Sequence, residues 1–396
     1  MKKNGFYKSS LYLLFAMVFS KGVAFILNIL CARYLDKDDF GQLAFLRSTA
    51  AMFEGMISGG NNNLVISSVD RRDFFSSVLF SYIIYIVFSI LISLVLFKIS
   101  FGGFLVVNEK SFFFMLLMLV FSSLLGMINS IYIARQESST MVVFSCCSGL
   151  MSAVIGGGLI FYESYYGALI SFVLYFGIDF LFKFLFFFSK ESGTRGRINF
   201  IEPSLFMRSL KLLIFTSSSA CFFWYVRNEL VLTNNGLEEL ADFELMYQFV
   251  TIAMIAIGAF TSTMLSKIGK EDGVIKKALV VGFLFSGLVY LFAYFLGGKI
   301  LAYINSSYSG VESILPRVVF IVFPFTVSSI ISKVLVVYKF EKYSVYSSIL
   351  SVFFCFMILF FGGKVNALVL ADLYSVYYAL LSVFSIFFLG RRKCQV

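Results

Sequence analysis

The feature that most restricts how this chain can fold is a series of long apolar segments joined by short polar turns. Each segment is close to the roughly 20 residues that an α-helix needs to cross a bilayer, where backbone polar groups must be paired within the chain. Twelve such segments fall at about 11–31, 42–66, 74–97, 111–133, 141–161, 167–188, 209–232, 243–265, 274–296, 315–337, 343–361 and 365–388. We therefore predict an all-α integral membrane protein with about 12 transmembrane helices.

The composition excludes several other classes of protein. Of the 396 residues, 60% are hydrophobic and 14% are charged, whereas a soluble domain carries about 25% charged residues. The formal charge is +10, but the basic residues are spread over short loops. We therefore expect the lipid bilayer as a partner and no nucleic acid. The chain has no histidine and no CxxC pair among its six cysteines, so we expect no metal, no cofactor, no catalytic residue and no enzyme.

The basic residues also indicate an orientation in the membrane. If the N-terminus is cytoplasmic, twenty Lys and Arg residues of the loops and ends fall on the cytoplasmic side and seven fall on the opposite side. This asymmetry follows the positive-inside rule. The apolar run after MKKNGFYKSS is too long for the core of a signal peptide, so we expect an uncleaved first span. Both termini are predicted to face the cytoplasm.

The distribution of polar residues between the segments predicts two halves. The longest interior connection, KESGTRGRINFIEPSLFMRSLK, follows the sixth segment and is strongly basic. We predict an N-terminal six-helix bundle at 1–189, a basic cytoplasmic linker at 190–208, and a C-terminal six-helix bundle at 209–396 with a short cytoplasmic tail. Such parallel repeats are common in transporters. The stretches LDKDDFGQLAF and LEELADFELMYQF, which follow the first and seventh segments, are a faint trace of the repeat.

Small residues mark one predicted helix-packing face. Ser145, Gly149, Ala153 and Gly157 recur every four residues in the fifth segment. Small side chains at this spacing allow two membrane helices to approach closely. We predict that this face packs against another helix.

Ionisable residues inside the apolar segments are the strongest functional signal. Each costs about 2.5–3.5 kcal/mol at the centre of a membrane helix unless it faces water or a partner. We consider nine of them: Lys21, Arg47, Glu54, Asp179, Lys183, Arg227, Glu229, Lys333 and Asp372. Such residues typically mark a pathway for a substrate or an ion.

Several polar side chains share helix faces. Residues seven apart drift by only about 20° around a helix, so Lys21 and Asn28 lie on one face of the first segment. The same spacing joins Arg47, Glu54 and Asn61 in the second. We predict that all five line a substrate-binding cavity, with the alternative that Glu54 only pairs with Arg47 or Lys21.

Arg227 completes the predicted cavity. It follows the small polar run at 216–219 in the seventh segment. These residues converge if the first, second, seventh and eighth segments line a central cavity. Cations in a wet cavity favour an anionic cargo, and arginine suits the geometry of phosphate.

The remaining charges have simpler alternatives. Asp179 and Lys183 are four residues apart and either form a charge pair or take part in ion coupling to H⁺ or Na⁺. Asp372 has no evident partner and is either a cavity carboxylate or a proton site. Lys333 lies about one turn from a helix end, where a lysine can snorkel to the interface. Glu229 lies near the outward end of its segment and is expected to be solvated.

One stretch resembles a known family. FSKGVAFILNILCARYLDKDDFGQLAFLRS, residues 19–48, resembles the polysaccharide exporters of the multidrug/oligosaccharidyl-lipid/polysaccharide (MOP) superfamily. It looks most like the Wzx-type O-antigen flippases of Gram-negative bacteria. The resemblance implies a V-shaped pair of six-helix bundles that works by alternating access. The implied cargo is an undecaprenyl-pyrophosphate-linked oligosaccharide, an O-antigen or capsule repeat unit, moved to the periplasmic leaflet of the bacterial inner membrane.

The same resemblance assigns Lys21 a role and separates the chain from one branch of the superfamily. In the related lipid II flippases a basic residue follows the FS pair and contributes to a cationic cavity, and Lys21 occupies that place here. Those relatives carry a second basic residue further along, where this chain has Leu27 and Asn28, and they have two extra helices. The departures favour a polysaccharide repeat unit over lipid II. A polysaccharide polymerase and chain-length proteins are further partners that the resemblance implies.

Two alternatives stay open. A drug or small-molecule exporter of the same superfamily would be expected to have a cavity dominated by carboxylates, whereas the nine ionisable residues considered above are five basic and four acidic ones. A membrane-embedded polysaccharide polymerase would typically place its catalytic residues on a long outward loop, and the loops expected on that side are short.

Overall fold

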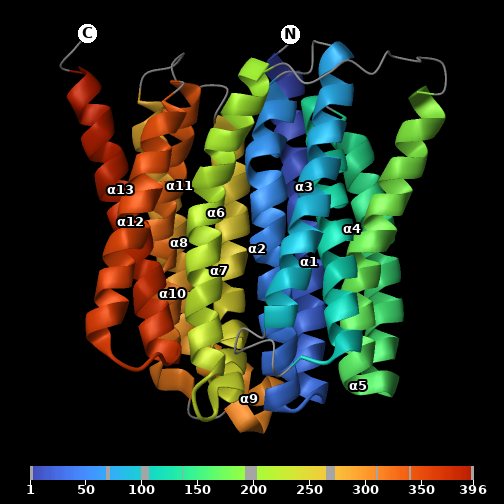
Figure 1. Ribbon diagram of the computed structural model, residues 1–396, viewed down its shortest axis with the longest axis vertical. Helices are drawn as coiled ribbons and strands as arrows, with labels where there is room; N and C mark the ends of the chain where they lie inside the picture. The colour runs from blue at the N-terminus through green and yellow to red at the C-terminus, as the bar shows by residue number, and fades with distance from the viewer. Residues whose placement is uncertain are drawn as a thin grey trace. The chain divides into compact units, whose positions relative to one another are not determined.

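The structure is a computed structural model that describes residues 3–67, 72–99, 107–135, 137–191, 203–264, 273–308, 311–338 and 340–393. In these ranges every regular element is a helix and no strand occurs. The elements are α1 (Lys3–Tyr34), α2 (Lys37–Ser67), α3 (Arg72–Ile99), α4 (Glu109–Ala134), α5 (Ser138–Glu191), α6 (Pro203–Val231), α7 (Gly236–Met264), α8 (Val274–Phe292), η2 (Ala293–Gly297), α9 (Gly298–Ile304), η3 (Ser306–Tyr308), η4 (Val311–Ser313), α10 (Leu315–Phe320), α11 (Val322–Val337), α12 (Glu341–Gly362) and α13 (Ala367–Lys393). The all-α prediction is confirmed for the described residues (Figure 1).

Seven helical stretches in the described ranges are long and apolar enough to cross a membrane. They are Glu109–Ile133, Ser139–Phe187, Gly236–Gly258, Val274–Ile304, Val311–Leu335, Lys342–Gly362 and Ala367–Gly390. These helices establish a multi-pass membrane protein. The other predicted segments lie in α1, α2, α3 and α6. That all of them cross the bilayer, in two six-helix bundles with cytoplasmic termini, stays a prediction.

The long helix α5 is a hairpin of two antiparallel helices. Ser164, at φ 50° and ψ −115°, breaks the helical backbone in its middle. The two halves then pack on each other, and the Ser171 hydroxyl donates to the Gly156 carbonyl across the hairpin at 2.9 Å. Gly167 lies so close to the other half that a Cβ there would be 2.0 Å from the Leu159 carbonyl oxygen. This turn lies in the gap between the fifth and sixth segments predicted from the sequence.

The packing of the helices divides the chain into two compact units. Unit 1 comprises Met1–Leu35 and Gln42–Trp224, and unit 2 comprises Asp36–Gly41 and Tyr225–Val396. The division therefore falls inside α6, whereas the predicted boundary is the linker at 190–208. Because residues 192–202 lie outside the described ranges, the linker stays a prediction.

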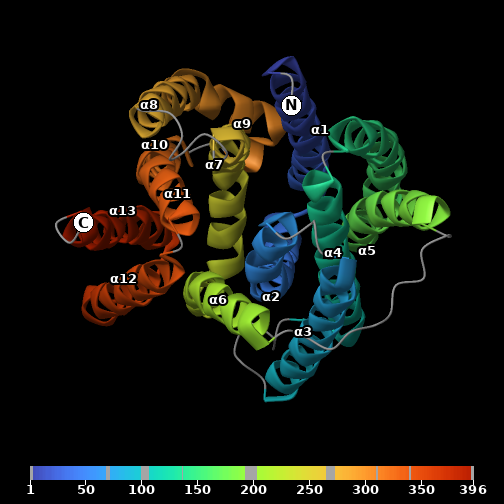
Figure 2. The same ribbon diagram turned by 90° about the horizontal axis from the view of Figure 1, so that it is seen from above.

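In unit 1, the hairpin α5 packs along α1 and against α4, which lie beside it in both views (Figures 1 and 2). The face with small residues predicted in the fifth segment is the packing surface. A Cβ on Gly149 would lie 2.9 Å from a Val23 methyl carbon and 3.0 Å from a Phe19 ring carbon. Gly157 lies against Leu30 in the same way. This packing fixes the position of α1, which carries Lys21.

In unit 2, α11 packs against α13, α8 and α7, and α12 packs against α13, as Figure 2 shows for α11, α12 and α13. Gly282 of α8 permits the close contact with α11, because a Cβ there would lie 2.6 Å from the Thr326 side chain. At the same level the hydroxyls of Ser286 and Thr326 are hydrogen-bonded at 2.8 Å. One tight, polar-linked helix pair thus stabilises the middle of unit 2.

The turn between α1 and α2 belongs to unit 2. Lys37 forms an ion pair with Asp242 of α7 at 2.8 Å, and a Cβ on Gly41 would lie 2.0 Å from the Leu237 carbonyl oxygen. The two acidic turns noted in the sequence as a trace of a repeat, 36–41 and 236–242, therefore touch each other. Burial raises the pKa of the Asp39 carboxyl in this turn, and its acidic neighbours add to that rise.

Candidate polar sites within the two units

Lys21 and Asn28 lie on one face of α1 but differ in environment. Asn28 is buried, with 1% of its surface exposed, and its amide donates to the Ala24 carbonyl at 2.9 Å. Lys21 is exposed, and it forms no hydrogen bond or ion pair with any other described residue. The space next to it is open, since a Cβ on Gly22 would meet nothing within 4 Å. The ammonium of Lys21 is therefore available to a ligand.

Arg47 of α2 reaches across to Asn28. Its guanidinium donates to the Asn28 side-chain oxygen and lies 4.1 Å from the centroid of the Phe172 ring. This combination of an amide and an aromatic face holds a planar cation in a fixed orientation. Arg47 is half-buried.

Glu54 lies one heptad beyond Arg47 on α2 but has different partners. Its carboxylate accepts a hydrogen bond from the Ser122 hydroxyl and interacts electrostatically with Lys21. Of the two partners considered from the sequence, the structure places Glu54 near Lys21. Asn61 is helical, but its side chain lies outside what the structure describes, so its predicted role stays a prediction.

Asp179 and Lys183 form a buried ion pair. Lys183 Nζ lies 2.7 Å from Asp179 Oδ2 and donates to the Asn129 side-chain oxygen at 2.9 Å. The Ser148 hydroxyl donates to the other oxygen of Asp179 at 2.8 Å. Lys183 is fully buried and Asp179 is 3% exposed. The predicted charge pair is confirmed, while a role of these two residues in ion coupling stays a prediction.

Arg227 is paired with other side chains within unit 2. Its two terminal nitrogens donate to Glu244 at 2.5 Å and to the Tyr374 hydroxyl at 2.6 Å. The rings of Tyr374 and Phe243 stack near the guanidinium, which lies 5.5 Å and 5.8 Å from their centroids. Arg227 is 9% exposed. Whether it shares a cavity with the basic residues of unit 1, as the sequence suggests, stays a prediction.

Asp372 and Lys333 lie in two different settings. Asp372 is exposed and lies 3.7 Å from Arg317 in a surface ion pair. Lys333 donates to the Gly258 carbonyl at 3.0 Å and to the Thr261 hydroxyl, so it binds α7 rather than snorkelling to a surface. Among the described residues, no three Cys, Asp or Glu side chains are grouped so as to hold a metal ion.

Several partners of these charges were not predicted from the sequence, among them Glu244, Tyr374 and Asn129. Glu244 lies at the start of the predicted segment 243–265 and was not among the nine charges considered. Tyr374 and Asn129 are uncharged, so the search for ionisable residues passes over them. The signal that could have identified them is the rule that a buried charge has a hydrogen-bonding partner, which calls for polar residues on the facing helix.

Comparison with known proteins identifies the fold. No family model matches the sequence, and no curated protein matches it. The eukaryotic MATE transporter AtDTX14 aligns with a TM-score of 0.68 at 14% identity, over 97% of this chain and 96% of that one. A MOP superfamily transporter from Pyrococcus furiosus aligns with a TM-score of 0.64 at 13% identity, over 98% and 95% of the two chains. The chain has the MATE-like fold of the MOP superfamily.

Further structures of this fold support the same conclusion. An outward-facing multidrug resistance MATE family transporter of the MOP superfamily aligns with a TM-score of 0.65 at 13% identity, over 98% of this chain and 95% of that one. At such identities the likeness establishes the fold and not the cargo. The fold is the one expected from the resemblance of residues 19–48.

Proposed function

We propose that this protein is a flippase that moves an undecaprenyl-pyrophosphate-linked oligosaccharide, an O-antigen or capsule repeat unit, across the bacterial inner membrane. The MATE-like fold supports a transporter rather than an enzyme. The observation that carries the choice of an anionic cargo is the exposed ammonium of Lys21 in an apolar helix, without an ion pair among the described residues. A positive charge left open in a membrane helix is suited to a negatively charged ligand.

The neighbouring groups of unit 1 fit a phosphorylated head. Arg47 is held by Asn28 and Phe172, an arrangement that orients the planar guanidinium, whose geometry matches phosphate oxygens. Lys21 and Asn28 share a face of α1, so the two basic side chains belong to one polar region of unit 1. The polyprenyl tail would remain in the lipid while the charged head meets these side chains. The resemblance of residues 19–48 to polysaccharide exporters points to the same cargo.

Glu54 competes with the phosphorylated head of the cargo for Lys21. Its carboxylate interacts with Lys21, so the ammonium stands between an internal carboxylate and a possible ligand. Binding of a diphosphate would draw Lys21 away from Glu54, and a proton taken up by Glu54 would favour that exchange. H⁺ is accordingly the coupling ion that this geometry suits best.

The proposal is tested in cells that lack this protein but still make the lipid-linked repeat unit. Surface polysaccharide and the lipid-linked sugar on the cytoplasmic side are measured after wild type, Lys21→Gln, Lys21→Arg or an empty vector is supplied. Wild type should restore the surface polymer. Lys21→Gln should lower transport about tenfold or more, the loss expected when a hydrogen bond to a charged group disappears. Lys21→Arg keeps the charge and should retain much of the activity.

The matched control is Lys110→Gln, which removes an exposed lysine at the start of α4 and should leave transport unchanged. Equal transport by Lys21→Gln and wild type, at equal protein levels, would refute the role of Lys21 while keeping the flippase. No restoration by wild type would refute the flippase.

A drug exporter is the second candidate. The structures that share the fold include multidrug resistance transporters, and Glu54 adds a carboxylate to the polar region of unit 1. The same cells distinguish the two functions by their sensitivity to lipophilic cations. Protection that depends on Glu54 and is unaffected by Lys21→Gln would favour drug export.

A further inference from the structure

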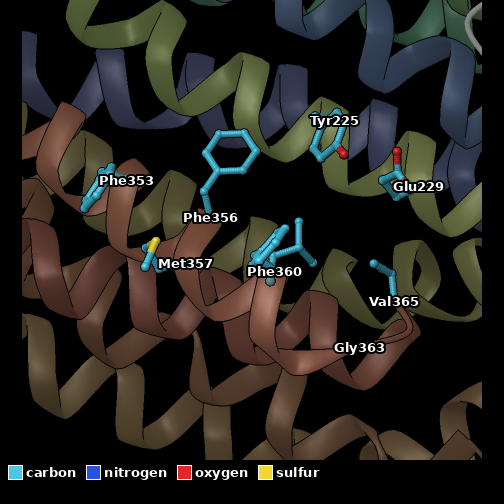
Figure 3. Close-up of a pocket in the computed structure, with 9 residues that line it drawn as sticks. Tyr225, Glu229, Phe353, Phe356, Met357, Phe360, Gly363 and Val365 are labelled. Atoms are coloured by element: carbon cyan, nitrogen blue, oxygen red, sulfur yellow. The ribbon is translucent and has the colours of Figure 1, made fainter.

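A cleft in unit 2 lies apart from the polar sites described above. It has a volume of about 400 Å³ and opens between the end of α6 and the second half of α12 (Figure 3). Its described lining includes Tyr225 and Glu229 of α6, and Phe353, Phe356, Met357 and Phe360 of α12. The volume is in the range of clefts that hold small molecules.

The cleft has a polar end and an apolar wall. Phe353, Phe356 and Phe360 follow one another along α12, and Phe360 is 83% exposed. At the other side Glu229 and Tyr225 project from α6, with the Tyr225 hydroxyl directed toward Glu229 (Figure 3). This hydroxyl donates a hydrogen bond to the carboxylate, which holds the negative charge at the edge of the cleft.

The polar end of the cleft lies near the ends of α6 and α12, where the edge of a bilayer is expected. Glu229 lies two residues before the end of α6, and Gly363 and Val365 lie in the turn between α12 and α13. Lys364, which is exposed, stands between these two lining residues. The polar end thus presents the Glu229 carboxylate, while the aromatic wall runs back along α12. The sequence analysis expected only a solvated carboxylate at position 229.

We propose that this cleft binds a bilayer phospholipid whose headgroup carries a primary ammonium. The ammonium would meet Glu229, and one acyl chain would lie along the aromatic wall of α12. Charge complementarity favours this occupant, because a diphosphate head or a purely anionic phospholipid would be repelled by the Glu229 carboxylate. The inference is independent of the proposed cargo.

The test is lipid retention by the purified full-length chain. The protein is equilibrated in detergent with equal amounts of phosphatidylethanolamine, phosphatidylcholine and phosphatidylglycerol of identical acyl chains, then exchanged into lipid-free detergent, and the retained lipids are counted by mass spectrometry. Wild type should retain phosphatidylethanolamine in preference to the other two. Phosphatidylcholine is the informative competitor, since its quaternary ammonium has no N–H to donate to Glu229.

Two variants in the cleft distinguish recognition of the headgroup from binding of the acyl chain. Glu229→Gln should lower the preference for phosphatidylethanolamine about tenfold, because it removes a charge-assisted hydrogen bond. Met357→Trp fills the cleft and should lower retention of all three lipids. Glu163→Gln, which changes an exposed carboxylate at the tip of the α5 hairpin, is the matched control and should behave like wild type.

Three results would overturn the inference. One is equal retention of phosphatidylethanolamine by Glu229→Gln and wild type. Another is equal retention of phosphatidylethanolamine and phosphatidylcholine by wild type. The third is displacement of phosphatidylethanolamine from wild type by undecaprenyl diphosphate added to the same mixture, which would show that the cleft serves the tail of the cargo instead.

Discussion

The two units treat their membrane charges in opposite ways. In unit 2, Arg227 is 9% exposed and both of its terminal nitrogens have partners, Glu244 and Tyr374. In unit 1, Lys21 is exposed and has no hydrogen bond or ion pair with another described residue. A charge that is satisfied within its own unit stabilises the packing, whereas a charge left open is free to bind something else. The presence of a charged residue in a membrane helix therefore says less about its function than the partners of that residue do.

The same contrast occurs between two lysines of unit 1. Lys183 is fully buried and bound to Asp179 and Asn129, while Lys21 lies open on α1. Both were equally conspicuous in the sequence as charges inside apolar segments. If the contrast is real, substitutions at the paired charges should lower stability, and substitutions at Lys21 should not.

The largest loss of stability is expected from Asp179→Asn. This change leaves the Lys183 ammonium buried without a negative partner, which costs about 3–5 kcal/mol in proteins. The measurement is the free energy of unfolding of the purified protein by denaturant titration in detergent micelles. The double variant Asp179→Asn with Lys183→Met removes both charges and should recover most of the loss. A double variant as unstable as the single one would show that the pair is not what stabilises this region.

A smaller loss is expected from Glu244→Gln in unit 2. Arg227 keeps the Tyr374 hydroxyl as a partner, and the side chains of Arg227 and Glu244 retain 11% and 13% of their exposure. The glutamine amide oxygen can still accept from the guanidinium, so the variant loses the negative charge, and the cost should be at most the roughly 1.5–3 kcal/mol of a hydrogen bond to a charged group. Tyr374→Phe, which removes only the neutral partner, should cost less than Glu244→Gln in the same unfolding experiment. The reverse order would mean that the carboxylate is not the main partner of Arg227.

Much of the fold could be predicted from the sequence because apolar length alone determines where helices form in a membrane. The hairpin in α5 illustrates this, since the polar gap between two apolar segments marks the turn at Ser164. The small residues around Gly149 likewise indicated a packing face, because a missing side chain permits close approach whatever the partner helix is. Neither inference needs knowledge of a distant residue.

The partners of the charges were harder to predict, and the reason is geometrical. Asp179 and Lys183 are one helical turn apart, so their contact follows from spacing. Arg47 and Asn28 are on different helices, and their contact depends on how α1 and α2 are rotated about their axes. Glu54, seven residues from Arg47, shares its helix face but not its partners. Spacing predicts contacts within a helix and leaves those between helices undetermined.

A still smaller effect is expected at Asp372, which the sequence analysis placed in a cavity or at a proton site. The structure shows it exposed and 3.7 Å from Arg317. Exposed ion pairs contribute about 0–1 kcal/mol. Asp372→Asn should therefore change the unfolding free energy by no more than that, and transport should keep its dependence on pH. A transport rate that no longer responds to pH in this variant would restore the proton-site hypothesis.

The smallest effect on stability is expected at Lys21, where the effect on transport is expected to be largest. Because its ammonium has no hydrogen-bonding partner among the described residues, Lys21→Gln should change the free energy of unfolding by within about 0.5 kcal/mol, as do most substitutions away from packed or paired positions. Glu54 keeps its hydrogen bond to Ser122, which limits any loss from the broken electrostatic contact. Unfolding and transport are measured on the same preparations, alongside Asp179→Asn. If Lys21→Gln loses as much stability as Asp179→Asn, then Lys21 is a structural partner of Glu54, and the contrast between open and paired charges fails where it matters most.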